Sequence, residues 1–202
     1  MGAKVGTSLL TKMSPSPALV RMKVPLPGEH QAINCGLALA MLDKLKACGY
    51  EIDDEKAING LNAVSLAGRM EMICQDPRIL IDGAHNAASI HALIHAIGQN
   101  IPYDSMVVIF GCNEDKDIEG MMHELQYGAD KVIFTRSNSV RAMSPFELSE
   151  VYVRISGKMC QTAASLGEAM QLAKGAISKE DLICITGSFY LIGQAKVRLQ
   201  SG

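Results

Sequence analysis

The residues best suited to chemistry lie in four short polar segments, each of which follows an apolar run. The segments cover residues 82–86, 111–117, 135–141 and 185–190. Short, uniformly apolar runs are typical of strands buried on both faces of a parallel sheet. In such a sheet, ligands bind beyond the carboxyl ends of the strands, near the amino ends of the helices. The four segments are therefore expected to meet at one ligand-binding edge.

The first segment, Asp82-Gly83-Ala84-His85-Asn86, carries the most chemistry. Asp82 can accept hydrogen bonds from a ribose or bind a cation, and His85 can orient or protonate a ligand. Asn86 also fits the start of the next helix, because asparagine is a favoured N-cap. The position of the segment at the expected ligand edge favours a site over a cap alone.

The other three segments each have a structural interpretation beside the functional one. Lys116 can meet a phosphate or carboxylate, or it belongs to a solvated loop that Asp117 ends as a helix cap. Arg136 and Arg141 suit planar carboxylates, although surface arginines are common. Ser188 follows a glycine at a helix start, where it can bind an anion or act as a plain N-cap.

The pattern of elements predicts an α/β fold from about residue 67 onward. Residues 70–74 alternate and pair with the next run, and apolar strands alternate with amphipathic helices after that. Strands are expected at 79–81, 106–110, 131–135 and 182–186, and helices at about 87–99, 117–127, 145–153, 166–178 and 188–199. This is a doubly wound, mostly parallel sheet covered on both faces, and we assign it to a domain of residues 67–202.

Residues 1–66 read differently. Four prolines space the first 27 residues, which predicts an irregular arm with one strand around 20–24. Helices are expected at 29–48 and from 55 to about 64, and no sheet is expected for this part. We interpret it as the tail of a different domain.

The composition excludes several classes of protein. Nineteen basic and 21 acidic residues give a formal charge of −2, which offers no general attraction to nucleic acid or anionic lipid. No apolar run could span a membrane, and no signal peptide is evident. The six cysteines form no C-x-x-C pair, so reduced thiols and a cytoplasmic location are expected. His91 and His95 have the spacing of a helical metal pair but no carboxylate in register, so no metal site is predicted.

Five motifs, in order and spacing, resemble one family. They are Pro25–Gln31 with Asn34, Ala67–Glu71, Asp82–Asn86, Asp115–Asp117 and Thr186–Leu191. Together they resemble folylpolyglutamate and dihydrofolate synthases of the Mur ligase superfamily, over the end of the central ATPase domain and the carboxyl-terminal domain. In two places, Ala67 and Ala87, alanine stands where the family usually has proline.

The resemblance implies an ATP-dependent amide ligase. Such an enzyme activates a folate or dihydropteroate carboxylate as an acyl phosphate, which the amine of glutamate then attacks. The family's P-loop, magnesium ligands and pterin-binding region lie upstream, and no G-x-x-x-x-G-K-[ST] sequence occurs here. The chain is therefore expected to be a fragment that needs the missing N-terminal ATPase region, ATP and Mg²⁺, and to be inactive alone.

The resemblance also implies roles for residues on the nucleotide side. Asn34 would lie near the base, and Arg69 would reach the ATP phosphates. Asp82 would contact nucleotide as the domains close, and Lys116 would be a further member of this site.

On the glutamate side, the resemblance implies that His85 and Ser188 line the place where glutamate and the acyl phosphate meet. Two other hypotheses remain open: a Mur-type ligase for another carboxylate, and a non-catalytic binding or regulatory module of the same fold. A receiver-like signalling domain is disfavoured, since it would leave the first 64 residues without a purpose.

Overall fold

The structure is a computed structural model that describes residues 8–13 and 19–200. The chain divides into two compact units, Met1–Ala67 and Gly68–Gly202, and each is described by itself. The boundary expected from the sequence, between residues 66 and 67, is adjacent to this division.

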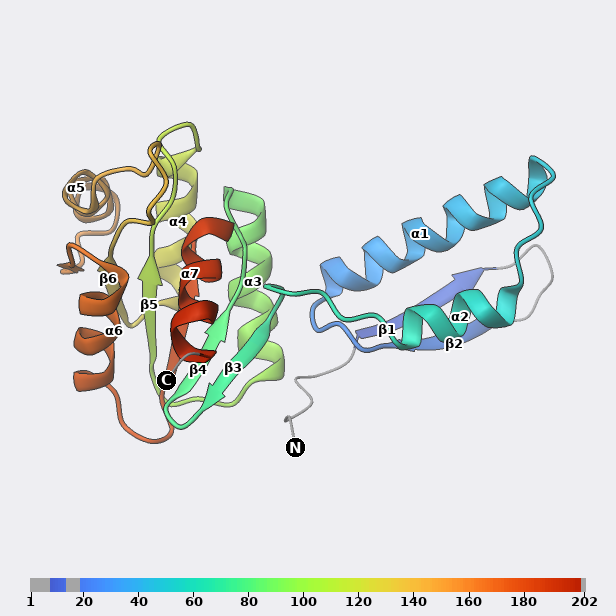
Figure 1. The fold of residues 1–202 in the computed structure, drawn as a ribbon, viewed down its shortest axis with the longest axis horizontal. Helices are drawn as coiled ribbons and strands as arrows, with labels where there is room; N and C mark the ends of the chain where they lie inside the picture. Colours follow the sequence, from blue (N-terminus) through green and yellow to red (C-terminus); the bar gives the residue numbers. More distant parts are fainter. Residues whose placement is uncertain (1–7, 14–18, 201–202) are drawn as a thin grey trace. The chain divides into compact units, whose positions relative to one another are not determined.

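The second unit is built on a six-stranded mixed sheet (Figure 1). In their order across the sheet, the strands are β3 (Glu71–Gln75), β4 (Arg78–Ile81), β8 (Leu182–Thr186), β5 (Met106–Phe110), β6 (Lys131–Phe134) and β7 (Gln161–Thr162). β3 is antiparallel to β4, and every other neighbouring pair is parallel. The mostly parallel α/β sheet predicted from the sequence is confirmed. The two-residue β7 has no counterpart among the predicted strands.

Burial along each strand follows its place in the sheet. Every residue of β8 and of β5 is buried, and these two strands are central. Both residues of β7, at one edge, are exposed, and β3 at the other edge is only half-buried. The uniformly apolar runs in the sequence thus mark the strands that are covered by helices on both faces.

Five helices cover the two faces of this sheet (Figure 1). They are α3 (Ala87–Asn100), α4 (Ile118–Gly128), α5 (Pro145–Ser156), α6 (Leu166–Gly175) and α7 (Phe189–Gln200). α3, α4 and α5 pack side by side on one face, and α6 and α7 lie on the other. Between the sheet and the second pair is a core that includes Ile109, Ile183, Met170 and Ile192.

Side-chain caps fix where several of these helices begin. Asn86 accepts from the backbone N–H of Ser89, whose hydroxyl in turn accepts from the Asn86 N–H. Asp117 and Ser165 each accept from the amide three residues on. Because a cap satisfies donors that the helix leaves free, each helix starts directly after the polar segment that follows a strand.

The first unit combines a small sheet with two helices. β1 (Ser8–Met13) pairs antiparallel with β2 (Leu19–Val24), and α1 (Glu29–Ala47) and α2 (Asp54–Asn62) pack near them. The expectation that this part has no sheet is wrong. β2 matches the predicted strand, but β1 is mixed in polarity, and its pairing depends on a partner that no local pattern specifies.

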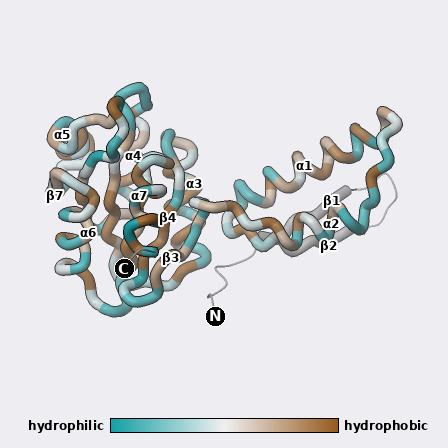
Figure 2. Tube along the Cα trace, viewed as in Figure 1, coloured by the Kyte–Doolittle hydropathy of each residue, from teal (hydrophilic) through white to brown (hydrophobic). Residues whose placement is uncertain are grey.

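Helix α1 is apolar on two faces. Cys35 and Leu39 are buried, whereas Ile33, Leu37 and Met41 are exposed by 64%, 62% and 60%. The exposed residues recur every fourth position and continue to Leu45, and Figure 2 shows hydrophobic segments repeating along the helix. A surface helix normally carries one apolar stripe, so α1 has the character of a helix packed between two layers.

Across residues 8–13 and 19–200, no helix combines the length and apolar character needed to cross a bilayer.

Candidate functional site

Backbone hydrogen bonds draw the four polar segments together at the carboxyl edge of the sheet. Asp82 donates its N–H to the Ile185 carbonyl at 3.1 Å, and Gly111 donates to Thr186 at 3.2 Å. Thr135 donates to the last residue of β5 at 2.9 Å. The segments that follow β4, β8, β5 and β6 are therefore neighbours along a single edge.

Two glycines allow this close approach. A Cβ on Gly111 would lie 2.4 Å from the carbonyl oxygen of Thr135, and a Cβ on Gly187 would lie 2.6 Å from the Gly111 carbonyl oxygen. Gly187 also has φ of 105°, a conformation that L side chains rarely adopt. The edge is thus built of backbone in contact with backbone.

Asp82 organises the start of the site. Its side chain is buried, with Oδ2 accepting from the Met70 N–H at 2.9 Å and Oδ1 from the Ala84 N–H at 2.8 Å. Met70 is a non-glycine residue at φ of 46°, a conformation that costs free energy and persists only when its surroundings hold it. The Asp82 carboxylate is one such constraint, since it ties the turn before β3 to the end of β4.

Arg69 is held between a carboxylate and an aromatic ring. Its Nη1 lies 3.9 Å from Asp82 Oδ1, and its Cζ lies 4.9 Å from the centroid of Phe189. One third of its side chain is exposed. The guanidinium is therefore oriented in advance, and the exposed part of the side chain is available to an anion.

The Phe189 ring occupies space that glycines leave free. A Cβ on Gly83 would lie 2.5 Å from two carbons of the ring, and a Cβ on Gly68 would lie 2.5 Å from Ile192. Any larger residue at position 83 must move the ring that supports Arg69. Close packing against the Phe189 ring thus explains why position 83 is a glycine.

His85 is fixed in one tautomer by its backbone contacts. The ring nitrogen Nδ1 lies 2.8 Å from the Gly83 carbonyl oxygen, and the backbone N–H of His85 donates to Ser89 Oγ at 3.0 Å. Because a carbonyl oxygen can only accept, the proton is assigned to Nδ1, and Nε2 is left as the second nitrogen. The ring lies 6.0 Å from Phe189, centroid to centroid.

Ser188 takes the structural role considered for it. Its side chain is buried, and Oγ accepts from the Leu191 N–H at 3.1 Å, which makes it the N-cap of α7. The hydroxyl hydrogen is a separate donor that this bond does not use. Ser188 also fixes the start of the helix that carries Phe189.

Two predicted residues have no contact with this group among the described residues or belong to the other unit. Lys116 pairs with its neighbour Asp115 at 3.1 Å, and in the described residues no contact joins it to Asp82 or His85. Asn34 belongs to α1 in the first unit, where its amide donates to Gln31 Oε1 at 3.4 Å. The structure thus brings together Arg69, Asp82 and His85.

Three further buried groups lie at this edge. Burial, and then the charge of Asp115, raise the pKa of the Cys112 thiol to about 12, so it stays neutral and is a poor nucleophile. The side-chain oxygens of Asn113 and Thr135 are buried without a hydrogen-bond partner among the described residues.

The interpretation of the histidine pair on α3 needs one correction. His91 does have a carboxylate beside it, since its Nδ1 lies 2.7 Å from Glu124 Oε2 on α4. The carboxylate was missed because it comes from another helix. Nevertheless, in residues 8–13 and 19–200 no group of three or more His, Cys, Asp or Glu side chains could hold a metal ion.

Phe189 is the residue that reasoning from the sequence does not single out. It appears there only as part of a motif, yet its ring contacts Arg69, excludes a side chain at Gly83 and lies near His85. It is 47% exposed although it is large and apolar. Its place directly after a glycine and a capping serine, at the first position of a helix, is the signal that could have identified it.

Comparison with known proteins identifies the family to which the second unit is similar. Residues 68–189 match the family described as Mur ligase, glutamate ligase domain. A dihydrofolate synthase/folylpolyglutamate synthase from Mycobacterium tuberculosis is 30% identical over 86% of this chain and 39% of its own length. A probable bifunctional folylpolyglutamate synthase/dihydropteroate synthase from Haloferax volcanii is 27% identical over 87% of this chain and 20% of its own length.

Solved structures agree. Mycobacterium tuberculosis folylpolyglutamate synthase complexed with ADP and AMPPCP superposes with a TM-score of 0.80 at 30% identity, covering 88% of this chain and 42% of that one. The chain thus spans about two fifths or less of the length of these relatives. The family match covers more than half of the chain, including Arg69, Asp82 and His85, and the chain therefore belongs to the Mur ligase family through its glutamate ligase domain.

Proposed function

We propose that this chain is the carboxyl-terminal part of an ATP-dependent ligase that joins glutamate to the carboxylate of a folate or dihydropteroate. The observation that carries the proposal is the match of residues 68–189 to a glutamate ligase domain. Relatives named as folylpolyglutamate and dihydrofolate synthases support the choice of substrates.

Arg69 is the group best placed to meet the phosphates. The similar Mycobacterium tuberculosis folylpolyglutamate synthase structure is complexed with ADP and AMPPCP, so that relative binds nucleotide. ATP would supply the phosphoryl group that activates the carboxylate. Arg69 fits such an anion because its guanidinium is charged, partly exposed and held between Asp82 and Phe189. The described residues offer no metal cluster, so we assign Mg²⁺ ligands to the region upstream.

In this proposal, Asp82 positions other groups and does not itself react. Two backbone amides and Arg69 already engage its carboxylate, so its main effect is to hold the turn and the guanidinium in one geometry. A preformed arrangement of charge stabilises a transition state without further reorganisation.

His85 is the group we assign to the amine of glutamate. The amine must be neutral to attack, and it loses a proton as the amide forms. With Nδ1 bound to the Gly83 carbonyl, Nε2 of the neutral ring is the nitrogen able to accept a hydrogen bond or that proton. Ser188, with its unused hydroxyl hydrogen, can donate to a carboxylate of the same substrate.

The upstream region of the relatives is the partner that we propose for the first unit. Its helix α1 exposes an apolar stripe of Ile33, Leu37, Met41 and Leu45, the feature expected of a helix covered on a second side. Relatives are long enough to supply that cover. We place Asn34, which is also on α1, on the nucleotide side of the joined domain.

The deciding experiment measures ATP turnover that depends on glutamate and on dihydropteroate or tetrahydrofolate. It uses this chain alone and the protein extended upstream by the region that the relatives carry. Activity should occur only in the extended protein and should fall about a hundredfold in His85→Ala. His123→Ala, which removes an exposed histidine on α4, is the matched control and should leave activity unchanged. Turnover that needs no pterin substrate would contradict the proposal.

A further inference from the structure

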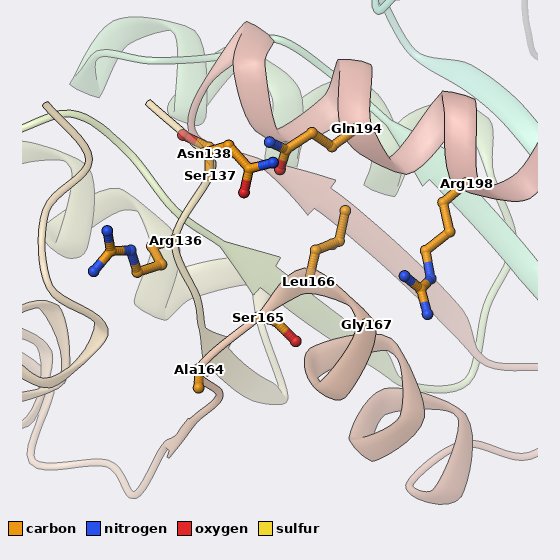
Figure 3. Close-up of a pocket in the computed structure, with 9 residues that line it drawn as sticks. All are labelled: Arg136, Ser137, Asn138, Ala164, Ser165, Leu166, Gly167, Gln194 and Arg198. Carbon is orange, nitrogen blue, oxygen red and sulfur yellow. The ribbon is translucent and has the colours of Figure 1, made fainter. Parts of the chain in front are cut away.

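A cavity of about 270 Å³ lies beside α6 and α7, beyond the ends of β6 and β7 (Figure 3). Three stretches line it: 136–138 after β6, 164–167 at the start of α6, and Gln194 with Arg198 on α7. None of the residues around Arg69, Asp82 and His85 takes part. It is therefore a separate feature of the domain.

The charge of the cavity is entirely positive. Arg136 and Arg198 both line it, no acidic residue does, and neither arginine forms an ion pair within the described part of the chain. Elsewhere in this domain, Arg154 lies against Glu119 and Lys196 against Glu71. Two unpaired guanidinium groups on one small cavity favour an anionic ligand.

Arg198 lies directly against the first turn of α6. A Cβ on Gly167 would be 2.9 Å from its Nη2 and 3.0 Å from its Cζ. Glycine at this position thus leaves room for the guanidinium beside first-turn amides that have no carbonyl partner within the helix. Glu168, a carboxylate in the same turn, accepts from the Ala164 N–H at 2.8 Å and does not line the cavity.

Neutral amides lie between the two charges. In Figure 3, Arg136 and Arg198 lie on opposite flanks of the cavity, with the guanidinium of the exposed Arg136 directed outward, while the side chains of Asn138 and Gln194 point toward one another. Primary amides can both donate to and accept from a peptide group. The arrangement therefore suits a ligand with carboxylates at both ends and an amide in between.

We propose that this cavity binds a short chain of γ-linked glutamates, a molecule with several carboxylates joined by amides. The choice of this ligand rests on the proposed function, since that reaction would build such a chain. The cavity would hold the tail of a substrate or product away from the reacting carboxylate. Free glutamate carries the same chemistry with only two carboxylates and no peptide amide, so it should bind more weakly.

The test is a titration of the ¹⁵N-labelled 202-residue chain with tri-γ-glutamate, followed by nuclear magnetic resonance. The backbone signals of residues 164–167 and the side-chain amides of Asn138 and Gln194 should shift together. Arg136→Gln and Arg198→Gln should each weaken binding about threefold to tenfold, and added salt should weaken it further. Arg154→Gln, which removes an arginine already paired with Glu119, is the matched control and should bind normally.

Two outcomes would overturn the proposal. One is shifts confined to residues outside the cavity, and the other is equal binding of inorganic phosphate, which would indicate a general anion site. Gly167→Ala supplies a second variant that keeps both charges: its methyl group displaces the Arg198 guanidinium, so binding should weaken while the fold persists. Loss of binding here leaves the pterin-dependent turnover assay unaffected, so the two proposals fail separately.

Discussion

The guanidinium carbon of Arg69 lies 4.9 Å from the centroid of the Phe189 ring. The two residues are 120 positions apart in the sequence, on opposite ends of the domain's chain. Asp82 completes the arrangement at 3.9 Å from the same guanidinium. A flexible, charged side chain is thereby held in one direction by an aromatic face and a buried carboxylate, which reduces the entropy lost when it meets an anion.

Replacing Phe189 with leucine should therefore weaken nucleotide binding more than it affects stability. The ring is 47% exposed, so its loss removes little buried surface, but Arg69 loses its support. In the upstream-extended protein we expect KM for ATP to rise about threefold to fivefold. Tyr190→Leu, at the next position, which is 57% exposed, should leave KM unchanged. An equal effect of the two substitutions would argue against a specific role for the Phe189 ring.

Gly83→Ala should disturb both the ring and the fold. The new methyl group would lie 2.5 Å from Phe189, which must move, and overpacking of this kind costs about 1–3 kcal/mol. Gly98→Ala in α3 is the opposite case, because nothing lies within 4 Å of its Cβ and alanine stabilises a helix by roughly 0.5–1 kcal/mol. Urea unfolding of both variants checks the two signs. Similar stability in the two would show that the ring yields without cost.

The central strands could be predicted because a strand that is buried on both faces consists almost entirely of apolar residues. β5 and β8 are apolar at nearly every position, as a strand covered on both faces must be. β7 and β1 escape this reasoning, since β7 is an exposed two-residue edge and β1 is defined by its pairing with β2. The local sequence thus indicates whether a strand is buried, but it does not indicate which strand it pairs with.

The residues of the candidate site also divide into those that the local sequence predicts and those that depend on distant contacts. Asp82 and His85 stand out because polar residues directly follow a buried strand, and the structure places both at the carboxyl edge of the sheet. The contribution of Phe189 depends on contacts that cross more than a hundred residues, and no spacing rule encodes them. Lys116 belongs to another polar segment that follows a buried strand, but it pairs with Asp115.

Asp82→Asn should destabilise the domain. One carboxylate oxygen becomes an amide group that cannot accept from the N–H of Met70 or Ala84, and the charge facing Arg69 is lost. A buried donor left without a partner costs about 1–3 kcal/mol. Asp117→Asn is the matched control: it is exposed at a helix N-cap, where asparagine serves equally well, so it should cost little. Chemical denaturation measures both, and equal losses would refute the organising role of Asp82.

Acid should weaken the contact between Glu71 and Lys196. Although burial raises the pKa of Glu71, the Lys196 ammonium and the Gly68 amide lower it more, and the net pKa lies below the ordinary 4.5. Stabilisation from this carboxylate is thus complete above that value and is lost as pH falls through the folded-state pKa. Melting temperature against pH should show Glu71→Gln below the unmodified chain near neutrality, with the gap closing in acid.

The depressed pKa of Asp181, held by the Ser178 amide, is common to both proteins and cancels in this comparison. A gap between the unmodified chain and Glu71→Gln that stays constant down to strongly acid pH would mean that the Glu71 charge does not contribute.

The apolar stripe of α1 should make the isolated chain self-associate. Leu37 and Met41 are each exposed by 60% or more on the same helix face, and contiguous exposed apolar surface promotes contact between copies. Leu37→Lys combined with Met41→Lys should shift the light-scattering mass toward a monomer. Ala47→Lys adds a charge at an exposed position at the end of α1, beyond the last residue of this stripe, so it should leave association unchanged. If upstream residues cover this face, the extended protein should be monomeric without substitution; a chain that is already a monomer at high concentration would remove the physical basis for that cover.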